Sequence, residues 1–243
     1  MPSTGEISDR VVAGETLIAA TPDAPASAVI VGYNWTMVEW ADGVGLVTTP
    51  EKGVDGARTT PQSGRYTRRS LRDLARLALS GNPYERAIGC AAVNAGINRH
   101  DLKGPSGNGL EPLVTVNGTT VVVGRFPSLD ERLPGALVLE RNPGPGDLPA
   151  SAAAEVIPGC ARLIITATTW VNESLAGLLR LVDGAHVSLV GPGTPLSPVL
   201  HGHGIHRLSG FVVTERIAMR QAISEGAGAR QFRHLGRDVN FEI

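Results

Sequence analysis

The run Thr119-Thr-Val-Val-Val-Gly124 decides the fold of this 243-residue chain. It is short, rich in β-branched residues and without polar alternation, which is typical of a strand buried on both faces of a parallel sheet. Similar apolar runs recur toward the C-terminus and alternate with segments of helical periodicity. Strands are expected over residues 136–140, 162–166, 186–190 and 211–214, and helices over residues 151–157, 172–181 and 215–224. Repeated strand–helix units predict an α/β domain with a mostly parallel sheet.

The first half of the chain has a different pattern, in which strands come first and helices follow. Short strands are expected over residues 28–32, 37–41 and 45–48, and helices over residues 11–20, 70–79 and 82–97. Asn82 is a suitable N-cap for the last of these helices, and Pro83 fits its first turn. This order predicts an α+β domain. We therefore divide the chain into an α+β domain over residues 1–110 and an α/β domain over residues 111–243.

The composition is that of an ordinary globular protein, with 42% hydrophobic and 19% charged residues. A formal net charge of −1 gives no basic field for nucleic acid or an anionic membrane. No stretch reaches the roughly 18 apolar residues that a membrane span requires. The first ten residues are polar, and Cys90 and Cys160 lie far apart. We therefore expect a cytoplasmic protein with reduced thiols and with neither nucleic-acid nor membrane partners.

Arginines cluster in one short segment of the first half. Arg68, Arg72 and Arg76 are spaced by four residues, so they would line one face of a helix. A solvated helix face is the favoured interpretation, and a patch that binds an anion or a partner is the alternative.

Two polar loops follow expected strands of the α/β domain. Thr166-Ala-Thr-Thr-Trp-Val-Asn172 and Gly191-Pro-Gly-Thr-Pro-Leu-Ser-Pro198 would both lie where an open parallel sheet binds its ligands, at the carboxyl ends of strands. The candidate binding residues in these loops are Thr168, Thr169, Asn172, Gly191, Pro192, Gly193 and Thr194. In the alternative interpretation Asn172 only caps the next helix, and the proline-rich loop is only a rigid turn.

The residues after the first two strands of the α/β domain complete the candidate site. Gly124, Arg125 and Phe126 follow the first strand, where a dinucleotide fold carries Gly-x-Gly-x-x-Gly. That fingerprint is missing, and Pro127 has no N–H for a phosphate, so a standard dinucleotide site is not expected. The arginine suits a ligand carboxylate or phosphate.

The second strand is followed by Glu140 and, two residues on, Asn142. An acid at this position often binds a ribose hydroxyl. A metal, a ligand amine, or an ion pair with Arg125 or Arg141 are the alternatives.

Other chemistry has weaker support in the sequence. The chain lacks the lysine of a P-loop, a Gly-x-Ser-x-Gly elbow and a His-Glu-x-x-His helix, so neither an NTPase nor a hydrolase is indicated. His201, His203 and His206 could surround a metal ion, since imidazole is a good ligand for zinc, nickel or copper. Flexible glycines between them and the lack of acidic neighbours favour exposed histidines without a metal, and their role stays open.

Several of these blocks occur together in a known family. The blocks over residues 82–89, 123–127, 140–143, 148–152 and 191–198 resemble, in this order, a bacterial and archaeal family of unknown function labelled "putative heavy-metal chelation". The resemblance covers about residues 29–226. It implies an enolase-N-terminal-like first domain, a Rossmann-like second domain and a homodimer. One departure is that many members carry a histidine where this chain has Arg125, which weakens a soft-metal role here.

These observations lead to one preferred function and one rival. We expect a binding protein that holds a metal ion, such as a transition metal, or a small metal-chelating metabolite in the crevice between its domains. Backbone amides and hydroxyls would hold anionic groups, Glu140 a metal or cation, and Arg125 a carboxylate. The rival is a lyase or transferase that uses the same crevice, with Glu140 and Glu85 as the available acid and base. A scaffold with a vestigial crevice is a third, weaker alternative.

Overall fold

The computed structural model describes residues 14–111 and 117–242. The strands are β1 (Ala28–Val31), β2 (Trp35–Trp40), β3 (Gly43–Thr48), β4 (Thr120–Val123), β5 (Leu137–Glu140), β6 (Leu148–Pro149), β7 (Arg162–Thr166), β8 (His186–Val190), β9 (Arg207–Val213) and β10 (Gly236–Glu242). The α-helices are one over residues 14–20, α2 (Leu71–Ala75), α3 (Pro83–Ile97), α4 (Leu129–Arg132), α5 (Ala153–Val156), α6 (Thr168–Val171), α7 (Leu175–Leu179), α8 (Arg216–Ser224) and α9 (Ala229–Phe232). Short 3₁₀ segments are η1 (Tyr66–Arg68), η2 (Arg76–Leu79), η3 (Ala150–Ala152), η4 (Pro198–His203) and η5 (Arg233–Leu235).

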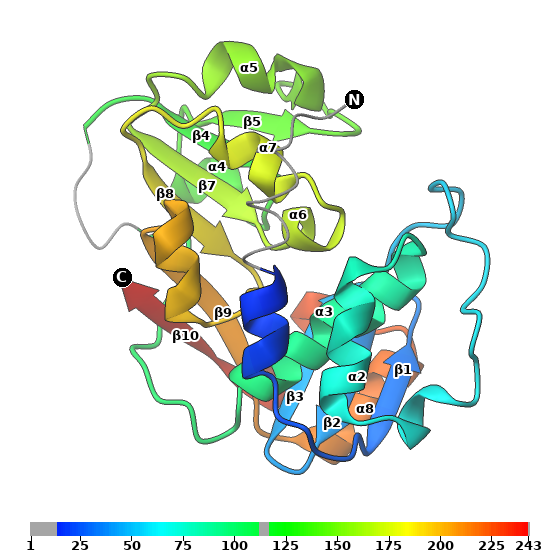
Figure 1. The fold of residues 1–243 in the computed structure, drawn as a ribbon. Coiled ribbons are helices and arrows are strands. Elements are labelled where there is room, and N and C mark those ends of the chain that lie inside the picture. Colours follow the sequence, from blue (N-terminus) through cyan, green and yellow to red (C-terminus); the bar gives the residue numbers. More distant parts are fainter. Residues whose placement is uncertain (1–13, 112–116, 243) are drawn as a thin grey trace.

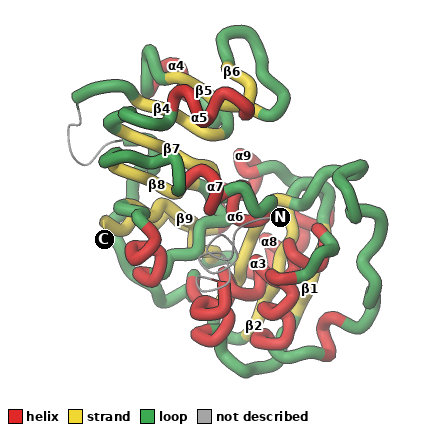
Figure 2. Tube along the Cα trace, turned by 45° about the horizontal axis from the view of Figure 1, so that its top comes forward, coloured by secondary structure: helices red, strands yellow, loops and turns green. Residues whose placement is uncertain are grey.

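Within the described residues these strands form two sheets. The smaller has the antiparallel order β1-β2-β3, and the larger has seven strands in the order β10-β9-β8-β7-β4-β5-β6. The strands β4 to β9 pair in parallel, and β10 is antiparallel to β9. The expected mixed α/β fold with a mostly parallel second sheet is thereby confirmed. In Figure 2 the strands β4, β7, β8 and β9 follow one another toward the smaller sheet, which β9 contacts through β3.

Every residue of β2 is buried, because helices cover both faces of the smaller sheet. Successive strand residues point to opposite faces. Val38 and Trp40 share a core with α3, and the indole N–H of Trp40 donates a 2.8 Å hydrogen bond to the carbonyl oxygen of Ala95. Trp35 and Met37 pack in a second core with α8. Figure 1 shows α3 and α8 on the two sides of this sheet, so a helix from the C-terminal part of the chain completes it.

Helix α3 packs against β3 almost backbone to backbone. The side chain of Asn82 accepts hydrogen bonds from the N–H groups of Tyr84 and Glu85, which confirms the expected N-cap. The helix presents a smooth face of alanines, and β3 presents Gly45. A Cβ atom at this glycine would lie 1.9 Å from the carbonyl oxygen of Ala91, so this position admits glycine alone.

The larger sheet reverses its direction of growth between β4 and β7. The chain goes from β4 outward to β5 and β6, then returns to β7 on the other side of β4 and continues to β8 and β9. In parallel sheets this switch point opens a crevice at the carboxyl ends of the two central strands. No helix within the described residues is long and apolar enough to cross a membrane.

Some expected elements differ from the structure in extent. The prediction of one continuous helix over residues 172–181 is wrong, because α6 ends before residue 172 and α7 covers only the middle of this range. Between them Glu173 has a positive φ of 69°, which stops a right-handed helix. The helix expected over residues 151–157 shortens to η3 and α5. The first three residues of the helix expected over 11–20 lie outside the described residues.

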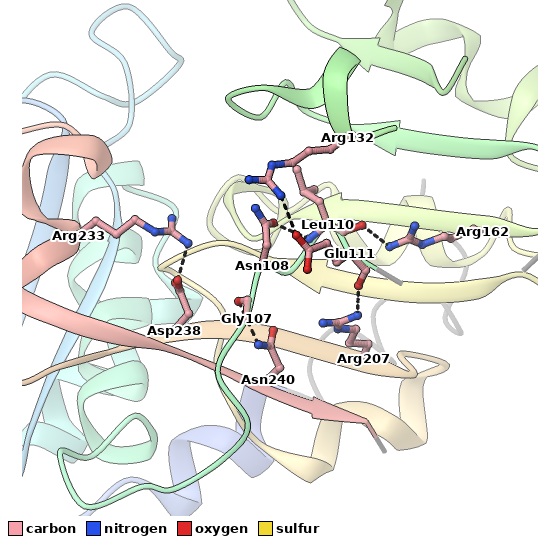
Figure 3. A network of polar contacts seen from close by, with 10 residues as sticks. All are labelled: Gly107, Asn108, Leu110, Glu111, Arg132, Arg162, Arg207, Arg233, Asp238 and Asn240. Carbon is pink, nitrogen blue, oxygen red and sulfur yellow. Dashed lines mark hydrogen bonds and ion pairs between the residues drawn. The ribbon is translucent and has the colours of Figure 1, made fainter. Parts of the chain in front are cut away.

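The segment that joins the two parts of the chain is fastened by buried arginines (Figure 3). Arg162 donates a 2.7 Å hydrogen bond to the carbonyl oxygen of Leu110, and Arg207 donates to that of Glu111. Both arginines are almost fully buried, and burial lowers the pKa of each guanidinium. Arg162 and Arg207 are the first residues of β7 and β9. Their bonds to the joining segment therefore lie at the amino ends of the strands, whereas the crevice of the switch point lies at the carboxyl ends.

Candidate functional site

A cavity of about 1030 Å³ opens over the carboxyl ends of β4, β5 and β7. Most of its lining comes from loops of the larger sheet, and Glu15, Glu51 and Leu79 come from the first part of the chain. The predicted site residues found in this lining are Gly124, Arg125, Glu140, Asn142, Thr168, Thr169 and Asn172. The structure therefore brings together residues that are up to 48 positions apart, counted from residue 124 to residue 172.

Gly124 is the residue at which the loop after β4 comes close to the end of β7. Its φ of 93° favours glycine, and a Cβ atom there would lie 2.6 Å from Cγ2 of Thr166. The missing side chain lets the backbone of this loop approach the end of β7. Gly124 and Thr166 therefore pack closely together in the lining of the cavity at the switch point.

Glu140 is a fixed carboxylate on the cavity wall. Its Oε1 accepts a 2.6 Å hydrogen bond from the backbone N–H of Arg125, and its Oε2 accepts a 3.1 Å bond from that of Arg141. Two N–H donors, one on each oxygen, fix the orientation of the carboxylate. Because a carboxylate has about four acceptor positions, each oxygen keeps capacity for a ligand.

The guanidinium of Arg125 is engaged by two carboxylates of the protein. Its Nη1 donates to both oxygens of Asp130 at 3.1 Å, and its Nη2 lies 3.5 Å from Oδ1 of Asp147, whose side chain is almost fully buried. The hydrogen bond with Asp130 is the main reason that the pKa of Arg125 is raised. A carboxylate on a ligand would have to displace the exposed Asp130 from this arginine.

Threonine hydroxyls from both sheets meet at the base of the crevice. Thr48 of β3 donates a 3.2 Å hydrogen bond to the hydroxyl of Thr168, and Thr166 lies 3.4 Å from the same oxygen. Thr169 is buried and donates to the carbonyl oxygen of Thr166. Thr48 also borders a neighbouring cavity of about 1090 Å³, which shares Glu51, Arg141, Thr168 and Asn172 with the first.

Asn172 does not cap the following helix, which corrects that alternative. Its Oδ1 accepts hydrogen bonds from the N–H and the hydroxyl of Ser174, at 3.1 Å and 2.7 Å, and α7 begins after Ser174. This short side-chain turn shapes the break between α6 and α7. The amide remains in the lining of the cavity.

The loop at Gly191, Pro192, Gly193 and Thr194 lies outside the lining of this cavity. The Nδ2 atom of Asn94 donates to the carbonyl oxygens of Gly193 and Leu46, and Nδ2 of Asn98 donates to that of Thr194. The loop thus joins α3 to the larger sheet. The sequence signal for this contact is an asparagine within the apolar face of α3, which helical periodicity by itself does not single out. Phe126 also lies outside the lining and packs beside a core cluster around Val122.

Glu85, the second acid of the enzyme alternative, is likewise outside the cavity lining. It is buried at the start of α3, where its carboxylate accepts hydrogen bonds from the hydroxyls of Tyr66 and Ser80 at 3.0 Å and 2.9 Å. Burial is the main reason that the pKa of Tyr66 is raised. Of the two acids considered for catalysis, Glu140 alone lines the crevice.

The histidines of the 201–206 segment make local contacts, and the rings of His201 and His206 lie edge to face with centroids 6.4 Å apart. His206 stacks on His186 with ring centroids 5.1 Å apart, and its Nδ1 accepts a hydrogen bond from the N–H of Val187. His203 borders a different cavity of about 310 Å³. In the part of the chain that the structure describes, no three His, Cys, Asp or Glu side chains are grouped to hold a metal ion.

Family models match both parts of the chain. Residues 111–242, more than half of the sequence, match the model of the DUF364 family, which is described as "Putative heavy-metal chelation". The chain belongs to this family. Residues 15–97 match a second model, DUF4213, with the same description. Comparison with curated proteins gives no relative.

Two solved structures of the DUF364 family share the fold along its full length. The protein of unknown function from Desulfitobacterium hafniense is 27% identical, with a TM-score of 0.84, and the match covers 97% of this chain and 100% of that one. The protein of unknown function from Pyrococcus horikoshii is 20% identical, with a TM-score of 0.82, covering 96% and 99%. The likeness of the first part to the enolase N-terminal domain stays a prediction.

The donors around the cavity do not fit a heavy-metal centre built from protein ligands. Soft metals favour thiolate and imidazole ligands, whereas the described lining offers carboxylates, hydroxyls and amides. Both cysteines are free and buried, and burial raises the pKa of Cys90 to about 12. This thiol is protonated at neutral pH and is no ready metal ligand.

Proposed function

We propose that this protein binds a small metal-chelating metabolite, with or without its metal ion, in the crevice between the two sheets. The observation that carries the proposal is the cavity of about 1030 Å³ at the switch point of the larger sheet. Its volume is at the upper end of the roughly 300–1,000 Å³ that small-molecule sites occupy. The family description supports metal chelation as the theme of the ligand.

The donor set favours a complete chelate over a bare heavy-metal ion. Oxygen donors bind soft metals weakly, so the organic ligand would supply the soft coordination itself. Glu140 would accept hydrogen bonds from the metabolite or neutralise a cationic group. Thr168 and Asn172 would bind its polar groups, and Arg125 would take a carboxylate by releasing Asp130.

Native mass spectrometry of protein purified without a histidine tag, together with elemental analysis, tests this function. We expect a retained small molecule near one per protomer, accompanied by metal in substoichiometric or equal amount. Glu140→Ala and Arg125→Ala should lower its occupancy, whereas Glu155→Gln on the exposed face of α5 should not. Unchanged occupancy in both cavity variants would refute the crevice as the binding site.

We further propose that the protein acts as a homodimer in the cytoplasm. The resemblance to the family supports the dimer, and the two free, buried cysteines are compatible with a reducing compartment. Light scattering coupled to size-exclusion chromatography measures the mass directly. A mass of one protomer at micromolar concentration would contradict the dimer.

A further inference from the structure

The position of Glu140 in the strand order corresponds to a recognised ribose-binding position. Counted across the switch point, β6-β5-β4-β7-β8-β9 follow the strand order 3-2-1-4-5-6 of sheets that bind nucleotides. In such sheets an acid at the end of the second strand accepts hydrogen bonds from the ribose hydroxyls. Glu140 is the last residue of β5, the second strand in this order.

The orientation of the carboxylate suits a pair of adjacent hydroxyls. The two backbone N–H donors approach one oxygen each, so the remaining acceptor positions of both oxygens are free in the plane of the group. Two neighbouring hydroxyls of a sugar can each donate to one of these oxygens. Gly124 lines the cavity beside them, and the side chain of Thr166 occupies the space next to this glycine.

The loop after β4 is at the same time unsuited to a phosphate. Pro127 has no N–H, and the helix that follows, α4, is short and carries Asp130 and Glu131 in its first turn. Arg125, the cation of this loop, is held by Asp130 and Asp147, while Arg141 and Arg180 line other parts of the cavity. A phosphate placed at the loop after β4 would meet the carboxylates of Asp130, Glu131 and Asp147, so we expect a phosphate at this loop to be disfavoured by charge.

We propose that the crevice contains a nucleoside subsite, in which Glu140 binds the vicinal hydroxyls of a ribose that carries no 5′-phosphate. The lining of the same cavity includes the apolar residues Leu139, Ala150 and Ala153, against which a base would pack. A nucleoside fills only part of the cavity, which leaves room for a 5′ substituent or a second ligand. This inference rests on the proposed function, since it specifies one chemical part of what the crevice holds.

Isothermal titration calorimetry with free nucleosides tests the subsite on the unaltered protein. Adenosine, guanosine, cytidine and uridine are compared first, and the tightest is then compared with its 2′-deoxy form and its 5′-monophosphate. We expect the 2′-deoxy form to bind roughly tenfold or more weakly, as loss of a hydrogen bond to a charged group implies. The monophosphate should also bind more weakly than the nucleoside. Failure of all four ribonucleosides to bind, or equal affinity for the ribo and deoxy forms, would overturn the subsite.

A substitution locates the effect at the carboxylate. Glu140→Gln places an amide N–H₂ group where two backbone N–H donors need acceptors, so the preference for ribose over deoxyribose should disappear. Glu155→Gln should retain that preference. Unchanged discrimination in Glu140→Gln would contradict the role of Glu140, even if nucleosides bind elsewhere.

The outcome is separable from the test of the metabolite site. A retained molecule without ribose, found by native mass spectrometry in a protein that ignores nucleosides, would overturn the subsite and leave crevice binding intact. Nucleoside binding that depends on Glu140, in a protein that retains neither metabolite nor metal, would support the subsite and count against metal chelation.

Discussion

At the scale of single residues, Asn94 has the most consequence for how the two sheets are held together. It is fully buried on α3, and its amide group donates to the carbonyl oxygens of Leu46, 3.1 Å away, and Gly193, 2.8 Å away. Leu46 belongs to β3 of the smaller sheet, and Gly193 lies in the loop that follows β8 of the larger sheet. One side chain thereby provides a donor to two backbone carbonyls, one in the smaller sheet and one in a loop of the larger sheet.

Asn94→Ala should lower the free energy of unfolding by about 1–3 kcal/mol, because the buried carbonyl oxygens lose their donor. Urea denaturation followed by circular dichroism measures the change. Gln221→Ala, an exposed amide on α8, is the matched control and should cost less than ~0.5 kcal/mol. A loss equal to that of the control would show that Asn94 does not join the sheets.

His206 should make the protein less stable in mild acid. Burial, followed by the charges of His186 and His201, lowers its pKa in the folded state. The unfolded chain therefore binds more protons as the pH falls below about 6.5, the ordinary value for histidine, and the free energy of unfolding decreases. His206→Asn keeps an acceptor for the N–H of Val187 but cannot be protonated. Its stability between pH 7.5 and 5.5 should fall less steeply than that of the unaltered protein, and equal slopes would contradict this origin.

The sequence alone could predict which polar residues meet at the crevice, because the carboxyl ends of parallel strands share one edge. This places Gly124, Glu140 and Thr168 together once the strands are recognised. The loop at Gly193 lies at the same edge, yet α3 covers it through Asn94. Contacts between elements 99 positions apart have no local signal, so this covering could not be foreseen. The binding role of all these residues stays a prediction.

At the scale of elements, the contact of α3 with β3 leaves no space for a methyl group at Gly45. Gly45→Ala should push the strand away from the helix and cost about 1–3 kcal/mol or more, as overpacking does. A Cβ atom added at Gly81, which lies in a turn, would meet no other atom within 4 Å, so Gly81→Ala serves as the control. Thermal unfolding should show a clear fall in Tm for the first variant only. Equal values of Tm would mean that the sheet and helix adjust without strain.

Elements with a clear end signal or a continuous apolar run were predicted well, and elements without such a signal were not. Asn82 and Pro83 fixed the start of α3, and the apolar runs located β4, β7 and β8. The segment 172–181 has a helical pattern of leucines, but Asn172 forms a local turn with Ser174 that competes with the helix. The strands β6 and β10 lie at the edges of the sheet, where polar residues are tolerated and the apolar signal is weak.

At the scale of the whole molecule, the C-terminal part of the chain completes the fold of the first part. Helix α8 covers Trp35, Met37 and Leu46, and Arg220 on this helix makes a bidentate ion pair with the buried Glu39 of β2. A fragment of residues 1–110 would expose this apolar face and leave that carboxylate without its partner.

We therefore expect the 1–110 fragment, produced alone, to lack cooperative unfolding in a thermal scan. Co-expression with residues 111–243 should restore a complex with a single transition. A fragment that unfolds cooperatively by itself would show that the first domain is independent of α8 and would support a division at residue 110.

The hydrogen bonds that hold residues 107–111 against the larger sheet affect how a ligand can enter the cavity. A hinge needs backbone whose dihedral angles change at little cost, and this segment has no such freedom. Its carbonyl groups at Leu110 and Glu111 are the acceptors for Arg162 and Arg207, which are buried at the far edge of the sheet. The second half is also held to the first by α8, which packs in the core of the smaller sheet and pairs with the buried Glu39 through Arg220. Rotating the halves apart would expose that core and leave a buried carboxylate without its partner. We therefore expect a ligand to enter and leave through movement of the loops that line the cavity, while the two halves of the molecule keep their relative position.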